Sequence, residues 1–262
     1  MRNNRLRALL KEGKPTVGTH LLSTWPGIVE VLGQTGEYDY VELVGEYAPY
    51  DLYALENFAR AAELHGMSAM LKVDQQPRTF LAQRALGSGF DSILFADVRT
   101  VTEADECVRI VRAETPDRGG IHGAGMRRNV GYVREPGSAD FVRWLDDAVV
   151  VLMIEKKGAV ENLEEILSLK GVDMLQFGPA DYSISIGIPG QWNDAKVREA
   201  ERRTIDLALE AGVRPRAEVG TLDGAKRYID LGVRDFCIGT DVSILSDYWK
   251  RTGDGLRKAL GV

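Results

Sequence analysis

The sequence is poor in cysteine and histidine and contains no long uninterrupted apolar stretch. Its 262 residues include two cysteines, Cys107 and Cys237, and 3 histidines. Two isolated cysteines predict no disulfide framework, and a reducing cytosol is the default location for such a chain. No stretch approaches the roughly 20 apolar residues of a membrane span, and the first residues lack the apolar core of a signal peptide. We therefore expect a cytoplasmic protein with no membrane partner.

Positive charge is also in deficit. The 33 lysines and arginines are outnumbered by 39 acidic residues, which gives a formal net charge of −6. No cluster of basic residues outweighs the acids around it, and this argues against a nucleic-acid partner. The composition is otherwise that of a globular protein, and 262 residues are ample to bury the core of an α/β barrel.

Apolar runs alternate with segments of helical periodicity along the whole chain. The strands that this pattern predicts are 16–22, 38–44, 67–73, 91–97, 149–155, 172–177, 213–219 and 234–241. Each is followed by a predicted helix, and no shift in composition marks a second domain. We therefore expect residues 1–262 to form a single (β/α)8 TIM barrel of the α/β class, with a doubly wound open sheet as the alternative.

One segment, at about 115–148, breaks this rhythm. It contains PDRGGIHGAG, three arginines within 127–134, and a Pro-Gly pair. An interruption of this length that is rich in glycine and arginine is more often a functional loop than a linker. We expect it to reach the mouth of the barrel.

Two acids end neighbouring strands near the middle of the chain. Glu155 closes the apolar run VVVLMIE, and Asp181 comes after the strand VDMLQF and the residues Gly-Pro-Ala. Parallel strands joined through a helix bring both carboxyl ends to one edge of the sheet. Two carboxylates there suit a hard divalent cation such as Mg²⁺ or Mn²⁺, although two solvated loop acids would give the same spacing. We further expect Gly178-Pro179 to form a tight, non-helical exit that directs Asp181.

Longer motifs resemble those of a known family. The run IEKKGAVENLEEILSLKGVDMLQFGPADYSISIG is similar to the stretch of HpcH/HpaI class II pyruvate aldolases that carries IE-T/S-x-x-A-x-x-N-x-x-E-I and then GPADLS. An opening KPTVG, the segment YDYVELVGEYAP beside the family's GFDW-x-x-x-DGEHAP, and a closing IGTD beside VGVD extend the resemblance over nearly the whole chain.

The resemblance implies a fold, a cofactor and part of a site. It implies a TIM barrel assembled into homohexamers and a divalent metal held by Glu155 and Asp181. A pyruvate unit would chelate the metal, which stabilises the enolate because a Lewis acid draws charge from the keto oxygen. The loop of Gly178, Pro179 and Ala180 would bind the substrate carboxylate, with the backbone N–H groups of Ala180 and Asp181 as donors.

Several positions depart from the family where its chemistry takes place. Tyr47 replaces the base histidine of the DGEH motif, and Val44 replaces its aspartate partner. Lys72 replaces an arginine that steadies the enolate, so the charge is kept while the bidentate fork is lost. Met153 replaces a glutamine before the metal glutamate, and Phe95-Ala96 replace a Val-Pro pair in the pocket wall. We expect Lys72 and Tyr47 to be catalytic in this altered setting, with Tyr47 as a hydrogen-bond donor rather than a base.

Other polar residues are candidates to compensate for the missing base. His20 ends the first strand, where barrels place catalytic groups, and is predicted to be catalytic. His122 and Arg127, in the 115–148 loop, are predicted to bind an anionic substrate, and Glu218 ends the seventh strand. A structural histidine or a solvated arginine is the plainer interpretation of each.

These observations predict a metal-dependent lyase that cleaves or forms carbon–carbon bonds in a small anionic 2-keto acid through a metal-bound enolate. A decarboxylase of β-keto acids is a close variant, since loss of CO₂ needs no base. An enolate-based isomerase or epimerase, or a barrel that binds without turnover, are further alternatives.

Overall fold

The computed structural model describes residues 4–262, and the predicted domain's residues 1–3 lie outside this range. Eight parallel strands form one closed barrel in chain order, β1 to β8, with β8 pairing with β1. The strands are β1 (Thr16–Leu21), β2 (Tyr40–Val44), β3 (Ser68–Val73), β4 (Ser92–Phe95), β5 (Val149–Ile154), β6 (Met174–Phe177), β7 (Arg214–Val219) and β8 (Asp235–Thr240). The (β/α)8 prediction is therefore confirmed, and the open-sheet alternative is wrong.

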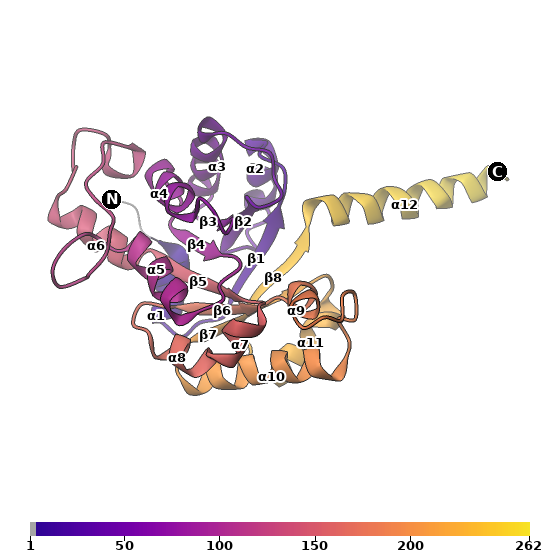
Figure 1. Cartoon of the computed structure of the whole chain (residues 1–262). Helices are drawn as coiled ribbons and strands as arrows, with labels where there is room; N and C mark the ends of the chain where they lie inside the picture. Colours follow the sequence, from indigo (N-terminus) through magenta and orange to yellow (C-terminus); the bar gives the residue numbers. More distant parts are fainter. Residues whose placement is uncertain (1–3) are drawn as a thin grey trace.

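Helices pack around this barrel, except that the last one extends away from it (Figure 1). They are α1 (Arg5–Lys11), α2 (Pro26–Gln34), α3 (Leu52–Leu64), α4 (Arg78–Ser88), α5 (Val101–Val111), α6 (Ala139–Asp147), α7 (Lys157–Glu161), α8 (Leu163–Ser168), α9 (Pro179–Ser185), α10 (Ala195–Glu210), α11 (Leu222–Asp230) and α12 (Asp241–Ala259). None of the helices within 4–262 combines the length and apolarity needed to cross a bilayer. The cytoplasmic location stays a prediction.

The strands are apolar runs because both of their faces are buried. Every residue of β5 is buried, and its side chains alternate between the barrel interior and the helical layer. Val149, Val151 and Met153 belong to an interior cluster, whereas Val150 and Leu152 pack under the surrounding helices. This double burial fixes the register of the strand, so the residue after its end is held at the barrel rim.

Helix α1 closes the amino end of the barrel. Asn4 caps it by accepting a hydrogen bond from the Arg7 N–H at 2.9 Å, and Leu6 inserts into the interior cluster. The Asn4 amide also donates to the backbone carbonyls of Asp91 and Asp147, which ties α1 to the β4 and β5 entrances. Solvent therefore reaches the interior from the opposite end.

Three local expectations about helices need correction. Pro179 is the first residue of α9, so the predicted non-helical exit is wrong; proline is well suited to a first helical turn, where its missing N–H has no partner to lose. The helix expected after Glu155 is divided into α7 and α8 at Asn162. The interrupted segment 115–148 also contains α6 and a short 3-10 turn, η1 (Arg128–Val130).

The glycine- and arginine-rich segment lies toward the amino end of the barrel. Arg127 Nη1 donates to the Gln83 carbonyl at 3.1 Å, and Arg128 Nη1 donates to the Ser88 carbonyl at 3.2 Å, both in the second half of α4. The reason is its place in the chain: the segment comes after α5 and before β5, and helix-to-strand connections in a barrel lie opposite the strand-to-helix connections. The expectation that it reaches the mouth is therefore not supported.

Candidate active site

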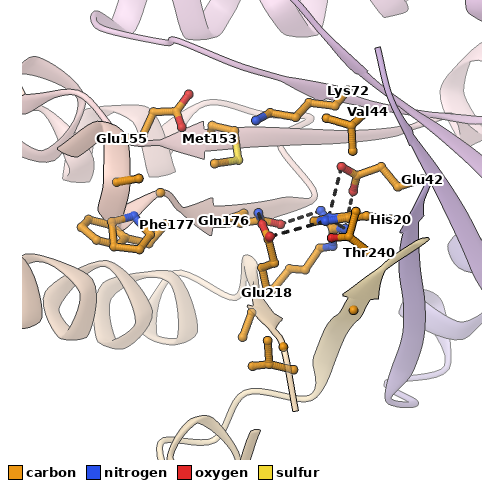
Figure 2. Close-up of a pocket in the computed structure, with 18 of the residues that line it drawn as sticks. His20, Glu42, Val44, Lys72, Met153, Glu155, Gln176, Phe177, Glu218 and Thr240 are labelled. Carbon is orange, nitrogen blue, oxygen red and sulfur yellow. Dashed lines mark hydrogen bonds and ion pairs between the residues drawn. The ribbon is translucent and has the colours of Figure 1, made fainter. Parts of the chain in front are cut away.

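A cavity of about 650 Å³ opens at the carboxyl end of the barrel. This is the end where barrel enzymes carry their sites, because all eight strand-to-helix connections meet there. Figure 2 shows its side chains, with Glu155 and Lys72 along one part and His20, Glu42 and Glu218 along another. The predicted site residues that line it are His20, Tyr47, Lys72, Glu155, Gly178, Pro179, Ala180 and Asp181.

Glu155 lies directly after β5 and is 3% exposed. Its Oε1 accepts a hydrogen bond from the Asp97 N–H at 2.8 Å. Asp97 has φ 61, in the left-handed region that residues other than glycine seldom adopt, and strained backbone of this kind is concentrated at functional sites. Burial raises the pKa of Glu155, while the Lys72 ammonium opposes that rise. The carboxylate is therefore placed beside a cation that compensates for its burial.

Asp181 is in the first turn of α9, just beyond β6. Its Oδ1 accepts a hydrogen bond from the Lys156 ammonium at 2.7 Å, and the same ammonium lies 2.6 Å from Asp97 Oδ1. Burial lowers the pKa of Lys156, but the two aspartates raise it more, so the group stays charged. One ammonium thus holds together the loops that come after β4, β5 and β6.

The pair Glu155 and Asp181 suits a divalent cation. Each carboxylate uses one oxygen for the contacts above, and a second oxygen offers lone pairs to a ligand. Gly178 leaves room beside Glu155, because a Cβ at that position would lie 2.5 Å from Oε2. Two carboxylates on a shared cavity with this clearance match the oxygen ligands that Mg²⁺ and Mn²⁺ prefer.

Lys72, near the end of β3, supplies a positive charge in the same cavity. Its ammonium lies 2.7 Å from Glu46 Oε2 and 5.2 Å from the centre of the Tyr47 ring. Burial lowers the pKa of Lys72, but Glu155 and Glu46 outweigh it, and the group remains an ammonium. Burial raises the pKa of Tyr47, although Lys72 opposes this. Tyr47 therefore carries a neutral hydroxyl, and its role as a donor to substrate stays a prediction.

A buried polar network forms the opposite part of the cavity, centred on Arg216 of β7. This guanidinium donates to Tyr40 Oη at 2.8 Å, to Gln176 Oε1 at 2.6 Å and to the Glu42 carboxylate. Arg216 and Glu42 are both fully buried, and the pair is charged. Burial alone would raise the pKa of Glu42, but Arg216 and then His20 lower it to about 2. Gly18 makes room for this network, since a Cβ there would meet the Tyr40 ring at 2.3 Å.

His20 lies between two acids in this network. Its Nε2 is 3.4 Å from Glu42 Oε1, and its Nδ1 is 3.4 Å from Glu218 Oε1. Arg216 Nη2 also lies 3.4 Å from His20 Nε2. Burial lowers the pKa of His20, but Cys237, Glu42 and Glu218 together raise it well above its ordinary value, which favours the imidazolium form. Ligand atoms of His20, Glu42 and Cys237 lie within 4.8 Å of one another, yet the raised pKa of His20 and the Arg216 guanidinium beside Glu42 make this group unsuitable for a metal ion.

Sequence motifs predict the residues of one part of the cavity better than those of the other part. Glu155 and Asp181 are predicted from acids at or just after strand ends that match the family pattern, and Lys72 from the position at which the family has an arginine. Glu42, Gln176 and Arg216 were not singled out, because each is an isolated polar residue within an apolar strand. The alternation of inward and outward side chains along each strand could have identified them. Glu42 and Arg216 occupy interior-facing positions at which a barrel normally places apolar residues.

His122 and Arg127 do not line this cavity. They line a separate small cavity of about 160 Å³ with residues of α4 and α6, including Gly87 and Phe141. The His122 ring packs edge-on against Phe141 at 5.8 Å, and burial and then the charge of Arg127 lower its pKa to about 4. Their predicted contact with substrate at the mouth has no support in this arrangement.

The similarity to known proteins extends over nearly the whole chain. Residues 17–242 match the family model described as HpcH/HpaI aldolase/citrate lyase. A hydroxypyruvate/pyruvate aldolase from Delftia acidovorans is 29% identical over 92% of this chain and 88% of the relative. A 4-hydroxy-2-oxo-heptane-1,7-dioate aldolase from Shigella flexneri is 30% identical over 93% of this chain and 89% of the relative.

A solved structure agrees with these relatives. An HpcH/HpaI aldolase from Desulfitobacterium hafniense superimposes with a TM-score of 0.86 at 27% identity, covering 97% of both chains. The family resemblance inferred from the motifs is confirmed, and aldolase-named relatives support an enzyme of the carbon–carbon lyase class. The chain belongs to the HpcH/HpaI aldolase/citrate lyase family.

Proposed function

We propose that the chain is a lyase dependent on Mg²⁺ or Mn²⁺ that cleaves or forms the aldol of a small anionic 2-keto acid through an enolate. The observation that carries this proposal is the convergence of Glu155, Asp181 and Lys72 on one cavity at the carboxyl end of the barrel. The two relatives described above are named for a pyruvate aldolase and for an aldolase of a 2-oxo diacid, which supports the same substrate class.

The cation site would consist of Glu155 and Asp181. A divalent cation bound there supplies a Lewis acid for the substrate keto oxygen. Gly178 is the N-cap of α9, Pro179 and Ala180 begin the helix, and a first helical turn has backbone N–H groups without intrahelical partners. The N–H groups of Ala180 and Asp181 would donate hydrogen bonds to the substrate carboxylate there.

Lys72 and Tyr47 would act on the developing negative charge. Breaking the carbon–carbon bond next to a ketone sends its electron pair toward the keto oxygen, and a buried ammonium stabilises that negative charge without needing to reorganise. The Lys72 ammonium lies among Glu155, Glu46 and Tyr47, which fixes its position. Tyr47 would donate a hydrogen bond, and His20 would supply a fixed positive charge across the cavity.

The proposal is tested with a panel of 2-keto and β-keto acids in the presence of Mg²⁺ or Mn²⁺, with pyruvate, aldehyde and CO₂ measured separately. We expect equimolar pyruvate and aldehyde from hydroxylated 2-keto acids, abolished by a strong chelator and restored by added metal. Undiminished turnover in the chelator would refute the metal requirement.

Lys72 gives a sharper test of the same proposal. We expect Lys72→Met to lower kcat by about 100-fold, because one charged stabiliser of the developing oxyanion is lost. Lys72→Arg is the matched control, since it keeps the charge and restores the family's residue, and we expect it to retain most of the activity. Equal rates for Lys72→Met and wild type would remove Lys72 from the mechanism.

Decarboxylation of a β-keto acid is the second candidate. It is favoured by Tyr47 and Val44, which stand where the family has a basic dyad, because loss of CO₂ leaves the same enolate without a base. CO₂ and pyruvate without aldehyde would select this candidate. Solvent deuterium entering unreacted substrate would instead select an isomerase, and tight keto-acid binding without turnover would select a binding barrel.

We also propose that the chain forms a homo-oligomer, the hexamer implied by the family resemblance. Helix α12 leaves the barrel after β8 and extends away from it (Figure 1). Large apolar side chains are exposed along this helix, and in water they favour a partner surface. They are Ile244, Leu245, Tyr248, Trp249 and Leu256. A monomeric mass in sedimentation at micromolar concentration would refute this proposal.

A further inference from the structure

The cavity contains a carboxylate to which the mechanism above gives no role. Glu218 lies on β7 at the carboxyl end of the barrel, and its side chain is 51% exposed within the cavity. Its Oε2 accepts a hydrogen bond from Gln176 Nε2 at 3.1 Å, and its Oε1 lies 3.4 Å from His20 Nδ1. Figure 2 shows Glu218 and Glu155 on different strands around the same space. The carboxylate is thus oriented by two contacts and still accessible to a ligand.

The three residues predicted to be catalytic are already protonated and cannot accept a proton. Lys72 is an ammonium, Tyr47 is a neutral phenol, and His20 is an imidazolium, each because of the neighbours described above. Burial would raise the pKa of Glu218, but contact with His20 outweighs it and leaves a carboxylate at neutral pH. Glu155 and Asp181 are assigned to the cation. Glu218 is therefore an ionised group in the cavity with lone pairs available to a substrate hydroxyl.

We propose that Glu218 accepts the hydroxyl proton of the bound aldol, with His20 and Gln176 as positioning residues that hold its carboxylate. The inference rests on the function proposed above and deepens it. The base histidine of the family is Tyr47 in this chain. Glu218, on the far side of the barrel from Tyr47, would take over the role of that histidine. The cavity of about 650 Å³ is large enough for a ligand that extends from one part to the other.

The proton and electron changes balance without an oxidant or reductant. The hydroxyl O–H bond breaks, and the proton moves to a Glu218 oxygen. The O–H electron pair becomes the second bond of the new aldehyde carbonyl, while the carbon–carbon bond breaks and leaves its pair on the keto-acid fragment as the enolate. Protonation of the enolate carbon by the neutral Glu218 acid then gives the keto acid and regenerates the carboxylate.

The surroundings of Glu218 keep it in the ionised form. The titratable and charged groups that face it come from four strands: His20 on β1, Glu42 on β2, Arg216 on β7, and Cys237 on β8 against His20. Because Arg216 is bonded to Glu42 and Gln176, its charge is compensated inside the barrel wall. The imidazolium of His20 is therefore the cation in direct contact with Glu218.

The test compares two reactions of one enzyme. Glu218→Gln is assayed with Mn²⁺ on 4,5-dihydroxy-2-oxopentanoate, whose cleavage requires loss of a hydroxyl proton, and on oxaloacetate, whose decarboxylation does not. We expect cleavage to fall by about 100-fold or more and decarboxylation to stay within about threefold. Glu218→Asp should recover part of the cleavage, and Asp247→Asn, which removes another carboxylate of the cavity wall, should leave both reactions within about threefold.

Every other outcome contradicts either the role of Glu218 or the proposed function, and the two cases can be distinguished. Cleavage by Glu218→Gln within threefold of wild type refutes the proton-acceptor role alone. Equal loss of cleavage and decarboxylation also refutes it, because Glu218 would then be structural. A wild-type chain that is inactive on both substrates refutes the proposed function itself.

A pH profile tests the role of His20. His20→Gln removes the positive charge that holds the pKa of Glu218 down, so the acid limb of kcat/KM for cleavage should move to higher pH by about one unit. The substitution leaves the carboxylate in place, which separates its effect from that of Glu218→Gln. An unchanged acid limb with a lower plateau would overturn the positioning role.

Discussion

The two ends of this barrel differ in the kind of connection that each collects. The carboxyl end collects the strand-to-helix connections and leaves a cavity of about 650 Å³ that contains Lys72, Glu155 and Glu218. The amino end collects the helix-to-strand connections, and α1 closes it with Leu6 inside the interior cluster. Chain direction alone therefore places the cavity with the candidate catalytic groups at one end and the helix that closes the barrel interior at the other.

Removing a carboxylate that we propose as a metal ligand should give the largest effect at the carboxyl end. We expect Glu155→Gln to weaken Mn²⁺ binding and to reduce pyruvate formation by about 1,000-fold, because a neutral amide is a poor ligand for a hard cation. Isothermal titration with Mn²⁺ measures the binding independently of turnover. Glu161→Gln, at a 60% exposed position in α7, is the matched control and should change neither quantity.

Unaltered Mn²⁺ affinity in Glu155→Gln would show that the cation is held elsewhere. The carboxyl end would then keep its cavity and lose its assigned chemistry.

Breaking the buried network inside the barrel should lower the stability of the fold rather than the affinity for metal. Glu42→Gln leaves the buried Arg216 guanidinium without its compensating charge, and we expect a loss of about 3–5 kcal/mol in the free energy of unfolding. Because the folded pKa of Glu42 is about 2, below its ordinary 4.5, this stabilisation is present above pH 4.5 and is lost as pH falls toward 2. Urea unfolding at pH 7 measures the difference.

An exposed ion pair provides the control for this experiment. Glu164→Gln removes a carboxylate that contacts Arg203 and is 58% exposed, and the free energy of unfolding should stay close to that of wild type. A loss as small as this in Glu42→Gln would show that the network is not an energetic unit.

The sequence predicted the barrel and half of the cavity for identifiable reasons. Strands such as β5 are apolar on both faces, so pattern alone locates them and the acids after them. The network of Glu42, Gln176 and Arg216 depends on contacts between strands that are distant in the chain, which no local motif encodes. Chain order alone could have corrected the loop that contains His122, because it comes after a helix and not after a strand.

The amino end has its own titratable group, which should affect stability with pH. Burial raises the pKa of Asp91 to about 7, against 3.8 for an ordinary aspartate. The folded state therefore keeps a proton that the unfolded chain has released, so stability falls as pH rises from about 4 to about 7 and levels off above. Between pH 5 and 8 we expect wild type to lose about 2 kcal/mol more than Asp91→Asn in urea unfolding. Parallel pH curves for the two proteins would contradict this assignment.

Substitutions in the glycine- and arginine-rich segment should have the smallest effect on activity. His122 and Arg127 lie against α4 and α6, away from Glu155 and Lys72. We expect Arg127→Ala and His122→Ala to keep kcat/KM within about twofold, with a loss of stability of about 1–2 kcal/mol for His122→Ala because its buried ring packs on Phe141. Kinetics are measured well below the melting temperature of each variant. A tenfold fall in kcat/KM at unchanged melting temperature would mean that this segment reaches the mouth of a barrel, in the same chain or in a neighbouring copy, and the separation of the two ends would fail.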